Sequence, residues 1–376
     1  MTLRRGFALA LIAARVAGAS PCAYHSEHWA ATGRYAVGVR TTTFVDSSRP
    51  TPPNGSYAGA PDRTLVTELW YPSTGTPGTL LRDAPISSAD GAFPLVVSSH
   101  GYFDTHAGLA HVATHLASRG YVVAAPDFPL SNFGAPGGPT LLDLANQPGD
   151  VTAVIDGVLA TFGPSVDPER IGLTGLSLGG ITTLLTTFHP RLRDPRVRAA
   201  LAIAPGACFF TKRAFRTTKA PLLLLHGDND LLLPFAENAL RAYRRDRPPD
   251  ALVRVKNGSH LGFTSVASLL DPSTHYDLLG CAVLRDIPNE PLPGLGTKRD
   301  GIDQDPRTCS LPCQKDPTGL PLDGARQAEL TRIVAAAFFE ATLGHDSSAD
   351  CFIEHFLEED NPELEVKQRG RLSRLR

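Results

Sequence analysis

Short runs of apolar residues alternate along this chain with longer segments in which apolar residues recur every three or four positions. The runs favour buried β-strands, and the longer segments favour helices that cover a sheet. This alternation predicts an α/β fold, with a mostly parallel central sheet that carries helices on both faces. Strands are expected at 35–45, 64–71, 93–98, 121–125, 170–174, 199–204, 221–226 and 251–255, and helices at 107–118, 141 or 149 to 162, 178–188, 234–245 and 327–343.

Two regions depart from this alternation. Residues 263–323 form a Cys/Pro/Gly-rich insert with weak periodicity, which is long for a loop inside a compact domain. Residues 354–376 alternate in charge and have little to bury, so we expect a disordered tail. The expected organisation is one α/β domain over residues 20–353.

The N-terminus has the pattern of an export signal. Arg4 and Arg5 precede an apolar run at 7–12, and Ala17-Gly18-Ala19 fits a cleavage site, so residues 1–19 are expected to be a signal peptide of a secreted or periplasmic protein. Arg15 interrupts the apolar run, which leaves a frayed N-terminal helix or a misplaced start codon as alternatives. Arg4-Arg5-Gly6-Phe7 also resembles a twin-arginine signal. No other segment is apolar enough to span a bilayer.

Composition narrows the function classes. The net charge is −2, so no basic field indicates a nucleic-acid partner. An even number of cysteines in an exported chain favours disulfides, and their connectivity is left open. A zinc site is the alternative to disulfides for Cys309 and Cys313, which are four residues apart. The six cysteines are Cys22, Cys208, Cys281, Cys309, Cys313 and Cys351.

Gly175-Leu176-Ser177-Leu178-Gly179 matches the G-x-S-x-G pattern of a nucleophile elbow. A serine on a sharp strand-to-helix turn projects its Oγ only if neighbouring side chains leave room, which glycine two positions to either side provides. The pentapeptide lies between an expected strand and an expected helix, which is the context the elbow requires. Ser177 is therefore the candidate nucleophile.

A serine nucleophile needs a base and an acid that orients the base. Asp230 follows the expected strand 221–226 and is our candidate acid, whereas Asp228 is expected to order the turn. His260 follows the last strand and is the candidate base. The backbone N–H groups of Leu178 and Tyr102 are expected to bind the oxyanion, with His100 bracing the Tyr102 loop. No cofactor or metal is expected.

From 35 to 343 the chain resembles the α/β-hydrolase superfamily. Within it, the chain looks like secreted bacterial dienelactone-hydrolase-like and platelet-activating-factor-acetylhydrolase-like serine esterases, which are similar to cutinase-like polyester hydrolases. The resemblance implies the same triad and oxyanion hole. The stretch from Cys208 to the strand at 221 is too short for the cap domain that many lipases of this fold insert there, so no large cap domain is expected. One departure is Ser177, where dienelactone hydrolases use cysteine. The resemblance is carried by 37–40, 46–49, 69–72, 99–101, 175–180, 226–234 and 258–260.

The leading hypothesis is a serine hydrolase of carboxylic esters that works through an acyl-enzyme. A phospholipid acetylhydrolase and a polyester hydrolase are the alternatives, so the substrate is a small-molecule, lipid or polymer ester. The alternative from another class is a catalytically silent binding protein on a hydrolase scaffold, which loss of a triad residue would favour.

Overall fold

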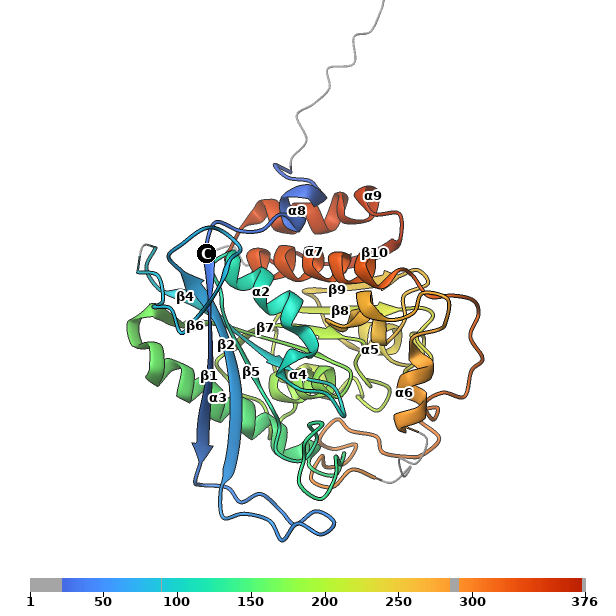
Figure 1. Cartoon of the computed structure of the whole chain (residues 1–376). Coiled ribbons are helices and arrows are strands. Elements are labelled where there is room, and N and C mark those ends of the chain that lie inside the picture. The colour runs from blue at the N-terminus through green and yellow to red at the C-terminus, as the bar shows by residue number, and fades with distance from the viewer. Residues whose placement is uncertain (1–21, 89, 285–290, 374–376) are drawn as a thin grey trace, which may run out of the picture.

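The computed structural model describes residues 22–88, 90–284 and 291–373. These residues form a ten-stranded sheet with the order β10-β9-β8-β7-β6-β4-β5-β2-β1-β3 (Figure 1). The expected export signal at 1–19 lies outside the described residues. The strands are β1 (Ala36–Asp46), β2 (Arg63–Ser73), β3 (Leu80–Arg82), β4 (Phe93–Ser99), β5 (Val122–Pro126), β6 (Val166–Leu176), β7 (Val197–Ile203), β8 (Leu222–Gly227), β9 (Asp250–Val255) and β10 (Leu364–Arg369).

The centre of the sheet is parallel from β5 through β9, as predicted. Strand β2 pairs antiparallel with β5 and with β1, and β10 pairs antiparallel with β9. Alternate residues of the central strands face opposite cores: Leu223 packs in one, Leu222 and Leu224 in the other. Burial on both faces explains why these strands read as continuous apolar runs.

Helices cover both faces of the sheet. None of the helices in the described ranges is long and apolar enough to cross a bilayer. On one face lie α1 (Ser26–Ala30), α2 (Ala110–Ser118), α7 (Gly324–Thr342), α8 (Ser347–His355) and α9 (Leu357–Asp360), and on the other α3 (Gln147–Phe162), α4 (Leu178–Phe188) and α5 (Ala239–Arg245) (Figure 1).

The prediction of a disordered tail at 354–376 is wrong for residues 354–373. Strand β10 extends the sheet along β9, from the Leu364–Val255 pair to the Arg369–Asp250 pair, and Leu364 is fully buried. The alternating charges lie on an edge strand, where one row of side chains faces solvent. The helix expected at 234–245 is also shorter than predicted, because regular helix begins at Ala239.

The segment between β7 and β8 holds a short 3₁₀ turn at Ala214–Arg216 and no cap domain, as expected. The insert instead contributes helix α6 (Asp277–Leu284), which Figure 1 shows at the edge of the molecule.

All six cysteines are paired, as Cys22–Cys351, Cys208–Cys309 and Cys281–Cys313. These pairings exclude the zinc alternative. Three disulfides are typical of proteins that fold in an oxidising compartment.

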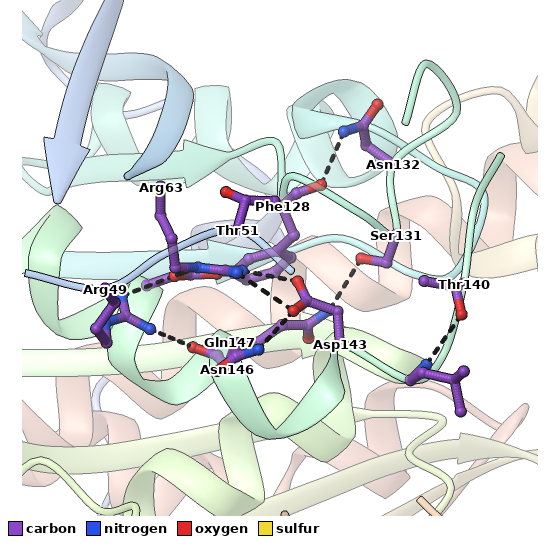
Figure 2. A network of polar contacts seen from close by, with 12 residues as sticks. Arg49, Thr51, Arg63, Phe128, Ser131, Asn132, Thr140, Asp143, Asn146 and Gln147 are labelled. Atoms are coloured by element: carbon purple, nitrogen blue, oxygen red, sulfur yellow. Dashed lines mark hydrogen bonds and ion pairs between the residues drawn. The ribbon is translucent and has the colours of Figure 1, made fainter. Parts of the chain in front are cut away.

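A buried polar network ties β2 to the start of α3 and to the loop after β5 (Figure 2). Arg63 is fully buried and forms ion pairs with Asp143 and Asp150 at 2.7 and 2.6 Å. Nearby, Gln147 donates to Ser131 Oγ at 2.9 Å. The carbonyl of Ser131 in turn accepts the backbone N–H of Phe103, so the network supports the loop that follows β4.

Candidate active site

Ser177 occupies the turn between β6 and α4, with φ of 58° and ψ of −114°. This left-handed φ is costly for a residue with a β-carbon, so the surroundings must hold it in place. Its N–H donates to the Ile203 carbonyl at 2.9 Å. A β-carbon on Gly175 or Gly179 would collide with backbone oxygens, so this turn requires both glycines.

His260 and Asp230 meet at the carboxyl ends of β9 and β8. Nδ1 of His260 lies 2.7 Å from Oδ2 of Asp230, and both side chains are buried. A carboxylate accepts hydrogen bonds, so Nδ1 carries the proton and Nε2 keeps its lone pair. Ser177 and His260 line the same pocket. The structure thus brings the three residues that the sequence proposed for a triad to one end of the sheet.

The electrostatics of this pair suit a base. Burial alone would lower the pKa of His260, but the charge of Asp230 and its hydrogen bond raise that pKa above the ordinary value of 6.5. Burial would likewise raise the pKa of Asp230, but the two imidazoles of His260 and His226 hold it well below the usual range. Asp230 is therefore an ionised partner of His260.

Asp228, the other acid of this loop, bonds to Arg254 and Asn257. Its carboxylate forms an ion pair with Arg254 at 2.6 Å and accepts the N–H of Asn257, also at 2.6 Å. Asn257 has a positive φ, so Asp228 orders the turn after β9. This geometry agrees with the preference for Asp230 as the acid.

Two backbone N–H groups are available for an oxyanion. Leu178 is the first residue of α4, where backbone N–H groups lack an intrahelical acceptor. The loop carrying Tyr102 passes beside Ser177, since a β-carbon on Gly101 would lie 3.5 Å from Cβ of Ser177.

His100 fixes this loop. Its Nδ1 donates to the Gly101 carbonyl at 2.7 Å, and its Nε2 accepts the N–H of Phe128 at 3.0 Å. Because the N–H of a trans peptide points opposite to its C=O, His100 orients the N–H of Tyr102.

A pocket of about 420 Å³ opens over Ser177. Apolar side chains dominate its lining, and four of them, Phe103, Val266, Leu279 and Val283, are also exposed to solvent. Tyr102 is part of the wall, and its hydroxyl donates to the Pro139 carbonyl. The insert supplies another part through Leu279, Gly280, Val283 and Leu284 of α6.

Two residues beside the candidate triad were not predicted from the sequence. His226 contacts Asp230: its Nε2 lies 3.1 Å from Oδ2 of Asp230 and 2.7 Å from the Leu233 carbonyl. The signal in the sequence was that His226 lies at the end of a strand and precedes Asp230 by four residues. Asp277, at the start of α6, contacts both triad loops, and no motif marks it.

A family model described as PET hydrolase-like matches residues 78–271, just over half of the chain. The chain belongs to the PET hydrolase-like family. The matched range contains Ser177, Asp230 and His260. This family confirms the predicted similarity to cutinase-like polyester hydrolases.

Curated relatives of this PET hydrolase-like chain include three hydrolases. It is 25% identical over 54% of its length to a bis(hydroxyethyl) terephthalate hydrolase of Streptomyces coelicolor, and 24% identical over 50% to a cutinase of Thermobifida alba. It is 29% identical over 31% of its length to lipase 1 of a Moraxella species. The matches span 65%, 64% and 35% of these relatives, less than two thirds in each case.

A solved ferulic acid esterase from Streptomyces cinnamoneus superposes with a TM-score of 0.59 and 24% identity, covering 89% of this chain and 97% of the other. At that identity the likeness concerns the fold. Together with the family, it confirms the predicted α/β-hydrolase fold.

Proposed function

We propose that this protein is a serine hydrolase of carboxylic esters, with Ser177 as nucleophile, His260 as base and Asp230 as the acid that orients it. The observation that carries the proposal is the buried 2.7 Å contact between His260 and Asp230 at the pocket that also contains Ser177. The hydrolase names of the relatives agree with this function.

In this mechanism Oγ of Ser177 attacks the ester carbonyl while Nε2 of His260 takes its proton. The N–H groups of Leu178 and Tyr102 stabilise the oxyanion of the tetrahedral intermediate. His260 then gives the proton to the departing alcohol, which leaves an acyl-enzyme. Water, deprotonated by His260, attacks the acyl-enzyme; the Oγ–acyl bond then breaks, the acid leaves, and His260 returns the proton to Oγ of Ser177.

A polyester is the second candidate substrate. Phe103, Val266 and Leu279 line the pocket and are exposed at the surface, so a polymer chain could contact them while one ester bond reaches Ser177. The terephthalate-ester hydrolase and the cutinase among the relatives favour the same class. We further propose export from the cytoplasm, which three disulfides support.

The test is a comparison of wild type with Ser177→Ala on p-nitrophenyl esters, bis(hydroxyethyl) terephthalate and a polyester film. We expect the wild type to hydrolyse the soluble esters, and Ser177→Ala to lose on the order of 10³-fold or more in kcat. A fluorophosphonate should label Ser177 in the wild type. Undiminished turnover by Ser177→Ala would refute the mechanism, and an inert film would remove the polyester candidate.

A further inference from the structure

Asp277 of α6 contacts the loops of both the candidate acid and the candidate base. Its Oδ2 accepts the backbone N–H of Leu231 and that of His260, each at 3.0 Å. Its Oδ1 accepts the N–H of Leu261 at 2.8 Å. The side chain is fully buried.

The donors explain why this contact matters. Leu231 immediately follows Asp230 on the loop after β8, and His260 lies on the loop after β9. One carboxylate thus joins two loops whose candidate acid and base are 30 residues apart in sequence. It binds the backbone N–H of Leu231, the residue after the acid, and the backbone N–H of His260, the base. The 2.7 Å distance between Asp230 and His260 depends on the relative position of these loops.

We propose that Asp277 is a positioning residue that sets the geometry of the Asp230–His260 pair. The inference rests on the proposed function, since it assigns Asp277 a role in that same reaction. Asp277 acts through the backbone of the two loops and contacts no reacting atom.

Helix α6 is anchored where this role requires it. A β-carbon on Gly280 would lie 2.8 Å from Cδ2 of Leu232, so the helix packs directly on the acid loop. The Cys281–Cys313 disulfide ties α6 to a segment whose Cys313 N–H donates to the Leu231 carbonyl at 2.8 Å. Leu231 is therefore held through its N–H by Asp277 and through its carbonyl by Cys313.

A role in helix capping alone does not account for these contacts. The three hydrogen bonds of the Asp277 carboxylate go to residues outside α6. A buried carboxylate is costly unless donors surround it, and here the donors belong to the triad loops. The hydrogen bonds from those loops offset the free-energy cost of burying the Asp277 carboxylate, and they fix the loops at the same time.

Asp277→Ala removes all three hydrogen bonds, and Asp277→Asn keeps one acceptor oxygen while placing an NH₂ group against a backbone N–H. Because a displacement of about 1 Å can cost on the order of 10²-fold in rate, we expect Asp277→Ala to lose about that factor in kcat. We expect Asp277→Asn to lose roughly tenfold. KM should change less than kcat, since the Asp277 side chain does not itself line the pocket.

Asp350→Asn is the matched control. Asp350 is also a buried carboxylate that accepts backbone N–H groups, from Leu372 at 3.1 Å and Ser373 at 3.4 Å, but on α8 and away from the triad. The Asp350→Asn substitution should lower the melting temperature of the protein and leave its kcat unchanged. The low-field proton resonance of His260 Nδ1–H gives a readout independent of turnover: it should persist in Asp350→Asn and be lost or shifted in Asp277→Ala.

The outcomes separate the two proposals. An unchanged kcat and an unchanged His260 resonance in folded Asp277→Asn and Asp277→Ala would overturn the positioning role, and so would an equal loss of kcat in Asp350→Asn. A wild type inert toward every ester would instead refute the proposed function. In that case loss of the resonance in Asp277→Ala would still support the positioning role.

Discussion

The carboxylate of Asp230 has three polar partners. Nδ1 of His260 donates to Oδ2, the backbone N–H of Leu233 donates to Oδ1 at 2.7 Å, and Nε2 of His226 lies 3.1 Å from Oδ2. These donors keep the carboxylate ionised although it is buried. The charge of Asp230 then keeps the pKa of His260 above its ordinary value.

This arrangement predicts the pH dependence of the proposed reaction. In that mechanism His260 must be neutral to accept a proton, so activity falls as the pH drops through its pKa. Because that pKa is raised, we expect the acid limb of kcat/KM to lie above pH 6.5. In Asp230→Asn the charge is gone and burial dominates, so the limb should move below pH 6.5 and kcat should fall on the order of 10³- to 10⁴-fold.

The measurement is kcat/KM on a soluble ester between about pH 5 and pH 9. Asp228→Asn is the control, because that carboxylate contacts Arg254 rather than His260, and its profile should follow the wild type. An acid limb that stays in place in Asp230→Asn would contradict the assignment of Asp230.

At the scale of elements, β10 completes the sheet beyond β9. Leu364 of β10 packs in the core between the sheet and α7, whereas Lys367 on the same strand faces solvent. Leu364→Ala should lower the free energy of unfolding by about 2–4 kcal/mol, and Lys367→Ala by less than about 0.5 kcal/mol. Urea denaturation measures both. Equal small effects would mean that the strand contributes nothing to stability.

The parts of the fold that could be predicted were those in which local pattern and burial agree. Continuous apolar runs such as 222–225 marked the central strands, and the glycines around Ser177 marked the elbow. Strand β10 was missed because charged residues alternate with Leu364 and Val366 on an edge. Asp277 could not be found because its partners come from loops that only the folded sheet brings together.

At the scale of the whole molecule, two of the three disulfides contribute in different ways. Cys22–Cys351 joins residues 329 apart and ties the start of the described chain to α8, away from the pocket. Cys281–Cys313 closes a loop of 32 residues beside the triad. Cys22–Cys351 therefore constrains the unfolded chain more, and Cys281–Cys313 constrains the candidate active site more.

Replacing both cysteines of each pair by serine tests this difference. The Cys22/Cys351 variant should lose about 2–5 kcal/mol of unfolding free energy with kcat unchanged. The Cys281/Cys313 variant should lose less stability, because its loop is shorter, and show a lower kcat because α6 is released. Denaturant unfolding and steady-state kinetics distinguish them. The reverse pattern would contradict this difference.

Helix α6 also suggests how the substrate range of this protein can be changed by engineering. Leu279 and Val283 are four residues apart, so they share one helical face, and both line the pocket. Asp277, Gly280 and Cys281 hold the helix in place. A mutagenesis library that varies Leu279 and Val283 and keeps the other three fixed would reshape the pocket while the triad loops stay anchored.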